Sequence, residues 1–164
     1  MNKSNKIVNI SVAGSAGRMG KMLVSAVHSH PECSLVAATC HPNESDIIGK
    51  DAGLVSGLGY INVPISSNPQ ELLKADVIID FTTPESTINN SNLATKNKTG
   101  HVIGTTGLSS DQEQTIRKNS LKAPIVYAAN MSVGVNLLIA LIEKAVKSID
   151  YDWDIEILEM HHRH

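Results

Sequence analysis

The sequence has 164 residues, of which 41% are hydrophobic and 18% charged, and its formal net charge at pH 7 is −2. This length and composition predict a globular chain with a hydrophobic core. Because the charges are mixed in sign, they exclude the basic block of a nucleic-acid surface or a polybasic membrane contact. We therefore expect neither nucleic acid nor a membrane as a partner.

Near the N-terminus, polar residues precede an apolar run that is too short for a signal peptide, and no stretch reaches transmembrane length. Cys33 and Cys40 lack a CxxC spacing, which is typical of free thiols in a reducing compartment rather than of metal ligands. We therefore expect a cytoplasmic protein without a metal site.

Short β-branched runs alternate with helix-like segments along the chain, and the run at Val77-Ile78-Ile79 is apolar on consecutive positions. Continuous apolarity indicates strands covered by helices on both faces of a parallel sheet. The pattern therefore predicts a doubly wound α/β fold. The candidate strands are Ile7 to Ala13, Ser34 to Thr39, Ile61 to Ile65, Val77 to Phe81, His101 to Gly104, Ile125 to Ala128 and Trp153 to His161.

Helix starts are marked by Asn68-Pro69, by Thr83-Pro84 and by Ser109 with Gln112 three residues later, and Gly100 is the expected stop of one helix. The stretch from Asn43 to Gly59 interrupts the alternation and indicates a long loop with at most one short helix.

The longest helical signal runs from Ser132 to Ile149, and Trp153, Ile155 and Ile157 then alternate with acids, as in a half-buried strand of a second sheet. We therefore expect a dinucleotide-type domain at residues 1–131 and the beginning of a second, α+β domain at residues 132–164.

A glycine-rich segment, Gly14-Ser15-Ala16-Gly17-Arg18-Met19-Gly20, directly follows the first strand and opens a helix. In this position Gly14 permits a tight turn, Gly17 lets the backbone approach a pyrophosphate, and Gly20 allows the helix to pack closely on the sheet. Arg18 offers a further phosphate contact. The spacing is GxxGxxG rather than GxGxxG, so a simple tight connection remains the alternative to a Rossmann-like dinucleotide site.

The second strand ends at Thr39-Cys40-His41, where a ribose-binding Asp or Glu is expected about 20 residues after such a motif. A thiol cannot accept both ribose hydroxyls, whereas a protonated His41 suits a 2′-phosphate. We therefore expect NADPH or NADH as the cofactor and leave the preference open, with a slight tilt toward NADPH. The alternative is that Cys40 and His41 are ordinary loop residues.

Small and hydroxyl-bearing residues follow three further strands, at Phe81 to Pro84, Gly104 to Gly107 and Ala128 to Ser132. Ligands bind beyond the carboxyl ends of strands in open parallel sheets, and such residues suit a flat nicotinamide ring with its carboxamide. Taken singly, each segment is equally explained as a helix cap or a turn.

Together these segments resemble the 4-hydroxy-tetrahydrodipicolinate reductase (dihydrodipicolinate reductase) family. The matching motifs are Gly14 to Gly20, Asp80-Phe81-Thr82 with Pro84-Glu85, Gly104-Thr105-Thr106-Gly107, Ala129-Asn130 with Ser132 to Asn136, and Glu159 with His161-His162-Arg163-His164. The resemblance implies a homo-oligomeric enzyme that reduces a small cyclic dicarboxylate with NADPH or NADH, on the route to diaminopimelate and lysine.

By position, the resemblance assigns a pyrophosphate-binding role to Gly14, Ser15, Ala16, Gly17, Arg18 and Met19. It places the nicotinamide among Gly104, Thr105, Thr106, Ala128, Ala129, Asn130 and Met131. Cys40 and His41 match a family acid and a neighbouring basic residue, and both depart from that pattern. Thr83 stands where some members carry arginine.

The resemblance makes His161 the proton donor and His162 a substrate contact. Hydride delivery to an unsaturated carbon leaves electron density that must be protonated, and an imidazole suits that task near neutral pH. A purification-tag remnant, a metal pair formed by His162 and His164, and a solvated strand end are the alternatives for these histidines.

The family pattern continues beyond His164 with a lysine and a substrate-binding turn. We therefore expect a fragment that retains nucleotide binding but has impaired reductase activity, and that self-associates through an exposed strand near residues 153–160. The rival functions are another dehydrogenase with the same nucleotide domain and a non-catalytic dinucleotide-binding or sensor module.

Overall fold

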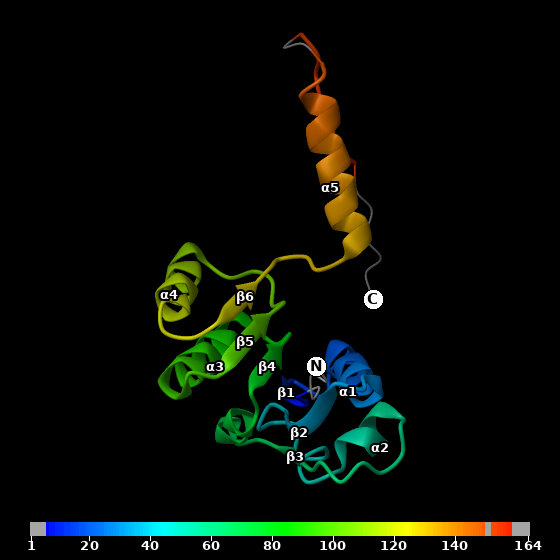
Figure 1. Ribbon diagram of the computed structural model, residues 1–164, viewed down its shortest axis with the longest axis vertical. Coiled ribbons are helices and arrows are strands. Elements are labelled where there is room, and N and C mark those ends of the chain that lie inside the picture. Colours follow the sequence, from blue (N-terminus) through cyan, green and yellow to red (C-terminus); the bar gives the residue numbers. More distant parts are fainter. Residues whose placement is uncertain (1–5, 150–151, 159–164) are drawn as a thin grey trace, which may run out of the picture. The chain divides into compact units, whose positions relative to one another are not determined.

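The computed structural model describes residues 6–149 and 152–158 (Figure 1). Contacts within the chain divide it into two units, residues 1–129 and residues 130–164, and each is described here by itself. In the described part of the chain, no helix combines the length and the apolarity needed to cross a membrane.

A six-stranded sheet forms the centre of the first unit, with the strand order β3-β2-β1-β4-β5-β6 and parallel pairing throughout. This confirms the predicted doubly wound α/β fold. The order reverses between β1 and β4, and in such sheets ligands bind outside the carboxyl ends of the strands at this switch point. The strands are β1 (Val8–Ala13), β2 (Cys33–Thr39), β3 (Ile65–Ser66), β4 (Val77–Asp80), β5 (Gly100–Ile103) and β6 (Ile125–Tyr127).

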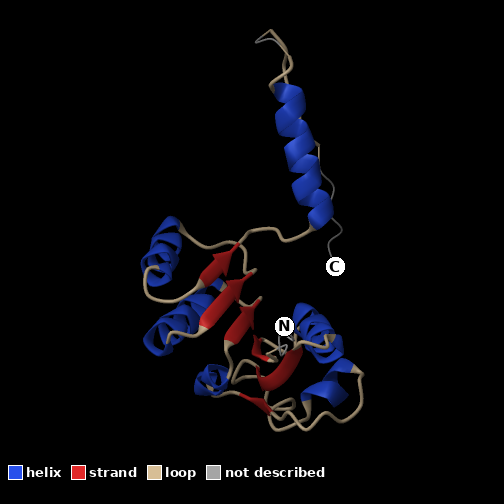
Figure 2. Ribbon diagram, viewed as in Figure 1, coloured by secondary structure: helices blue, strands red, loops and turns tan. Residues whose placement is uncertain are grey.

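Helices cover both faces of this sheet (Figure 2). On one face α1 (Arg18–Ser29) packs against α2 (Ala52–Ser56). On the other, α3 (Pro84–Asn97) packs against α4 (Ser110–Ser120) and against the 3-10 helix η1 (Pro69–Lys74). Because both faces are covered, the strands bury apolar side chains on both sides, as their sequence predicted.

The hydrophobic core has one part on each face of the sheet. Next to α1 and α2, a cluster of buried side chains includes Ile10, Val12, Val24 and Leu35. On the face of η1 and α3, Ile78 and Leu72 belong to a smaller cluster, which is completed by the small side chains Ala13 and Ala94. The β1–β4 pair at the middle of the sheet therefore contributes to both clusters and is held from both sides.

The predicted helix starts are confirmed. The side chains of Asn68 and Thr83 cap η1 and α3, and Ser109 forms a capping box with Gln112, whose side chain accepts the Ser109 N–H at 2.8 Å. The predicted stop at Gly100 is wrong. Lys98 ends α3 in the left-handed conformation, with φ of 57°, and Gly100 already belongs to β5.

The expected strand at Ile61 to Ile65 is shortened to Ile65–Ser66. The backbone N–H groups of Ile61 and Val63 donate to the carboxylate of Asp51, at 3.1 and 2.9 Å, instead of to a neighbouring strand. A side chain from the loop has therefore replaced the strand ladder here, which the pattern of apolar residues does not reveal.

In the second unit, α5 (Val133–Val146) confirms the long helix, and the Ser132 hydroxyl caps it by accepting the N–H of Val135 at 3.4 Å. Residues 153–158 form no strand, so the expectation of one from Trp153 onward is wrong for this part. A strand requires a pairing partner as well as alternating side chains, and alternation alone predicted it. The remainder of that expected strand lies outside the described residues.

Candidate functional site

The glycine turn after β1 adopts the geometry that its spacing predicts. Gly14 has φ of +68°, in the region that favours glycine. A Cβ on Gly20 would lie 2.1 Å from the carbonyl oxygen of Gly14, so α1 can pack this closely only with glycine there. At Gly17 a Cβ would meet only that same oxygen, at 3.4 Å, so packing within the chain does not demand a glycine at this position.

Helix α1 begins after Gly17 without a side-chain cap. Gly17 is the N-cap residue, and no side chain of the described residues accepts a hydrogen bond from the first turn. Its own N–H donates to the Gly14 carbonyl at 3.1 Å, which closes the turn. Uncapped N–H groups at the start of a helix form an anion site. Arg18 and Met19, at the start of α1, are exposed at this end.

Ser15 serves the framework of the turn. It is buried, and both its N–H and its hydroxyl donate to the carbonyl of Thr39, at 2.8 and 3.1 Å. These two bonds fix the glycine turn against the end of β2. A pyrophosphate would have to compete with the carbonyl of Thr39 for the same two donors of Ser15. Ala16, the next residue, packs against the adjoining core cluster.

A cavity of about 980 Å³ opens at the carboxyl ends of β1, β2 and β4 and at the start of α3. Four of the predicted cofactor residues line it: Gly14, Gly17, Cys40 and His41. The sequence analysis assigned no role in the site to several other lining residues, which are Pro42, Glu44, Ser67, Asn89, Asn90 and Gln112. Only their place in the chain could have indicated that they line the cavity, because most of them lie just after a strand or in the first turns of a helix.

The loop after β2 folds back on itself at the edge of this cavity. The N–H of His41 donates to Oε2 of Glu44 at 3.0 Å, and the N–H of Glu44 donates to the carbonyl of His41 at 2.9 Å. The thiol of Cys40 is buried, and its pKa is raised by that burial and by the hydrogen bond and negative charge of Glu44. Cys40 is therefore a neutral thiol at neutral pH and a poor nucleophile.

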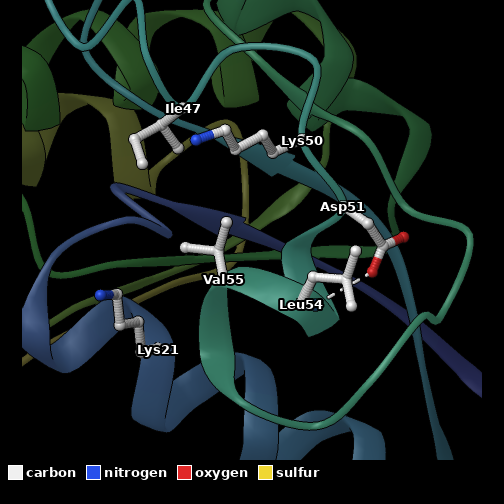
Figure 3. A pocket seen from close by; sticks show the side chains of 6 residues that line it. All are labelled: Lys21, Ile47, Lys50, Asp51, Leu54 and Val55. Atoms are coloured by element: carbon white, nitrogen blue, oxygen red, sulfur yellow. Dashed lines mark hydrogen bonds between the residues drawn. The ribbon is translucent and has the colours of Figure 1, made fainter.

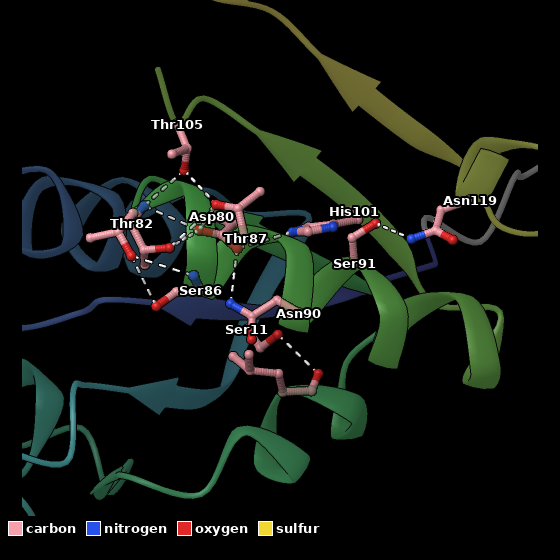
Figure 4. Close-up of polar contacts among 12 residues, drawn as sticks. Ser11, Asp80, Thr82, Ser86, Thr87, Asn90, Ser91, His101, Thr105 and Asn119 are labelled. Atoms are coloured by element: carbon pink, nitrogen blue, oxygen red, sulfur yellow. Dashed lines mark hydrogen bonds and ion pairs between the residues drawn. The ribbon is translucent and has the colours of Figure 1, made fainter. Parts of the chain in front are cut away.

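A buried carboxylate, Asp80, holds the end of β4 to its neighbours (Figure 4). Its Oδ1 accepts from the N–H and hydroxyl of Thr82, at 3.1 and 2.6 Å, and from the hydroxyl of Thr87 at 3.2 Å. Its Oδ2 accepts from Asn90 Nδ2 at 2.9 Å and lies 3.2 Å from His101 Nε2. Burial acts to raise the pKa of Asp80, but the hydrogen bonds from His101, Thr82 and Asn90 outweigh it and lower that pKa.

The network reaches the predicted nicotinamide segment through Thr105. Its buried hydroxyl shares the N–H of Thr82 with Asp80, at 3.0 Å, and lies 2.7 Å from the hydroxyl of Thr87, whose one proton also faces Asp80. Gly104 is required by packing, because a Cβ there would lie 2.1 Å from the ring of Phe81. The structure thus joins the segments after β4 and β5, while the Thr106 side chain is exposed.

The other predicted nicotinamide residues follow β6. Ala128 donates its N–H to the carbonyl of Ile103 at 3.2 Å, and Ala129 ends the first unit. In the second unit, Asn130 accepts the N–H of Ser132 at 2.8 Å, and Met131 is exposed. The proposed catalytic His161 and substrate-binding His162 lie outside the described residues, as do Glu159, Arg163 and His164.

A second, smaller hollow of about 390 Å³ lies between α1 and α2 (Figure 3). It is lined by the amines of Lys21 and Lys50, by apolar side chains and by Asp51. Burial acts to raise the pKa of Asp51, but four backbone N–H groups, those of Ile61, Val63, Leu54 and Gly53, lower it. Asp51 is therefore an anchor for the loop around it.

Comparison with known proteins identifies relatives of this chain. The family described as dihydrodipicolinate reductase, N-terminus, matches residues 8–131. A 4-hydroxy-tetrahydrodipicolinate reductase from Afipia carboxidovorans is 47% identical over 157 residues, which are 95% of this chain and 57% of that protein. Another, from Rhizobium rhizogenes, is 43% identical over 163 residues, which are 98% of this chain and 59% of that protein.

Solved structures that are similar to this chain include a member of the same family. A dipicolinate-bound dihydrodipicolinate reductase from Paenisporosarcina sp. TG-14 is similar with a TM-score of 0.69 and 26% identity, over 85% of this chain and 54% of that one. A probable dehydrogenase from Thermotoga maritima, with a TM-score of 0.60 and 15% identity over 86% of this chain and 41% of that one, shares the fold alone. The chain spans somewhat under two thirds of the length of the curated relatives named here.

Proposed function

Because the chain belongs to the dihydrodipicolinate reductase family, we propose that it binds NADH or NADPH in the cavity at the ends of β1, β2 and β4. The observation that carries this proposal is the uncapped start of α1 beside Gly17, which opens onto that cavity. Backbone N–H groups in this position suit the pyrophosphate, and the absence of a side chain at Gly17 leaves room for it.

The nicotinamide end of the dinucleotide is assigned to the segments after β5 and β6. Thr105 and Gly104 are held against the end of β4, which supports a fixed place for the ring. Ala128, Ala129, Asn130 and Met131 complete this part of the proposal by their position in the sequence. When bound, the reduced dinucleotide supplies the hydride, and these residues orient it.

For the whole protein we propose the reduction of 4-hydroxy-tetrahydrodipicolinate in the biosynthesis of diaminopimelate and lysine. The names of the relatives support this reaction, and the bound dipicolinate of the Paenisporosarcina protein supports a small cyclic dicarboxylate as the substrate class. In this reaction His161 would donate the proton and His162 would contact a substrate carboxylate.

Titration of the purified 164-residue chain with NADH and with NADPH tests the binding proposal. We expect saturable enhancement of dihydronicotinamide fluorescence, and a weaker response from Gly17→Ala, whose new methyl group would occupy the space proposed for the pyrophosphate. A chain that is folded by circular dichroism but leaves the fluorescence of both nucleotides unchanged would overturn the proposal.

A reductase assay on the same preparation tests the expectation of impaired turnover. We expect nucleotide binding with a rate far below that of a full-length relative measured in parallel. A rate equal to that of the relative would contradict the expectation. Binding without any reduction by the whole protein would instead favour a non-catalytic dinucleotide-binding module.

A cytoplasmic location suits a biosynthetic reductase, and localisation of a tagged protein checks this prediction.

Self-association of the chain is also expected, because the apolar side chains of Trp153, Ile157 and Leu158 are exposed. These residues form no strand, so the expected contact is between apolar side chains and not between strand edges. A clean monomer in sedimentation at high concentration would contradict it.

A further inference from the structure

The cavity contains an acid that the glycine motif alone does not predict. The position expected to carry a ribose-binding carboxylate holds the Cys40 thiol, but the chain turns back after β2 and brings Glu44 to the same cavity. Glu44 is only half-buried, so its carboxylate borders both the cavity and solvent.

The surroundings of Glu44 fix its carboxylate without saturating it. Oε2 accepts the N–H of His41 at 3.0 Å, and the carboxylate also interacts with the Cys40 thiol. A carboxylate offers about four acceptor positions, so these two donors leave room for the hydroxyls of a sugar.

The place of Glu44 in the cavity suits the ribose next to the pyrophosphate. Ser15, within the glycine turn, donates to the carbonyl of Thr39, so the turn and the end of β2 are adjoining segments. Gly17 and Glu44 line the same cavity from these two segments. In this fold, an acid near the end of the second strand binds the adenosine ribose.

The same surroundings are unfavourable to a 2′-phosphate. Among the described residues that line the cavity there are two glutamates, Glu44 and Glu85, and neither a lysine nor an arginine. The Nδ1 of His41 accepts the N–H of Asn43 at 3.2 Å, so this ring nitrogen is already used within the loop. Thr83, which also lines the cavity, uses its hydroxyl to cap α3.

We propose that Glu44 replaces the missing acid of the second strand: its carboxylate accepts the adenosine ribose hydroxyls and repels a 2′-phosphate, so that the chain selects NADH over NADPH. This inference rests on the proposed dinucleotide binding. It reverses the slight tilt toward NADPH that the sequence alone suggested, because that tilt considered His41 without the carboxylate of Glu44, which lies in the same cavity.

The test measures dissociation constants of the 164-residue chain for NADH, NADPH and the 2′-deoxyadenosine form of NADH. We expect the unmodified chain to bind NADH at least about tenfold more tightly than either of the others, which is the effect of a hydrogen bond to a charged group. In Glu44→Gln we expect the preference for NADH over NADPH to shrink by about tenfold, and the effect of removing the 2′-hydroxyl to shrink with it.

Asp46→Asn is the matched control, because it removes one negative charge from the same exposed loop at a residue that does not line the cavity. We expect it to leave the preference within about twofold. Equal or tighter binding of NADPH by the unmodified chain would overturn the inference and leave the proposed function intact, whereas binding of neither nucleotide would overturn both. These measurements on the unmodified chain keep the inference testable if Glu44→Gln fails to fold. An equal loss of the preference for NADH in Glu44→Gln and in Asp46→Asn would also refute the inference.

Discussion

Replacement of Asp80 by asparagine is the sharpest test of how the first unit is held together. The carboxylate is fully buried and lies within hydrogen-bonding distance of five donor groups, three at Oδ1 and two at Oδ2. An asparagine keeps one oxygen and turns an NH₂ group toward donors, so at least two of these bonds are lost. At about 1.5–3 kcal/mol for each hydrogen bond to a charged group, two lost bonds give an expected loss of about 3–6 kcal/mol.

Urea denaturation at pH 7 followed by far-UV circular dichroism measures this loss, because the helices and strands of the first unit contribute to that signal, whereas the only tryptophan, Trp153, belongs to the second unit. Asp76→Asn is the control. Asp76 is exposed and its carboxylate accepts one backbone N–H, that of Asn9 at 2.9 Å, so its replacement should cost less than about 1 kcal/mol. Equal losses in the two variants would refute the assigned importance of the buried network.

The pH dependence gives a second readout of the same residue. The pKa of Asp80 is lower in the folded than in the unfolded chain. The ionised carboxylate therefore stabilises the fold fully when the pH is above the pKa of the unfolded chain, and this stabilisation is lost as the pH falls through the pKa of the folded chain. The difference in stability between the unmodified chain and Asp80→Asn should therefore narrow below about pH 4. A constant difference from pH 7 to pH 3 would contradict the lowered pKa.

Three further predictions concern the backbone. Gly20→Ala should destabilise the first unit by about 1–3 kcal/mol in urea denaturation, because the new Cβ would meet backbone atoms. Gly17→Ala should change the stability by less than about 1 kcal/mol, and a larger loss in Gly17→Ala than in Gly20→Ala would be incompatible with the packing of α1. Lys98→Gly should raise the free energy of unfolding by about 1 kcal/mol, because Lys98 ends α3 at φ of 57°, and a decrease would argue against this assignment. Asp51→Asn should speed hydrogen exchange at the four N–H groups that its carboxylate accepts, and unchanged exchange there would show that the loop has another anchor.

The sequence was most informative where a structural role depends on neighbouring residues. The glycine turn and the caps at Asn68, Thr83 and Ser109 are local patterns, and the structure contains each of them. The strands were found because burial on both faces leaves continuous apolar runs. The stop of α3 was misplaced by two residues because a lysine took the left-handed conformation that usually belongs to glycine.

Structural roles that depend on distant partners could not be predicted in this way. Asp80 and His101 are 21 positions apart, and only the pairing of β4 with β5 brings their side chains together. Asp51 reaches Val63 across 12 positions and thereby shortens a strand that the local pattern favoured. Glu44 lies close to the motif in sequence, but its direction is set by a turn whose closing hydrogen bonds no spacing rule encodes.

The polar network at the end of β4 differs in kind from the apolar packing below it. Ile78 and Leu72 fill space in the core, and apolar residues of similar volume would do so equally well. Asp80 instead fixes the N–H of Thr82 and, through Thr87, the hydroxyl of Thr105, which belong to segments after two different strands. An apolar residue in place of Asp80 could give the fold the same stability, but it could not fix the positions of these two polar groups. The buried carboxylate therefore links the integrity of the sheet to the geometry of the two segments that follow it.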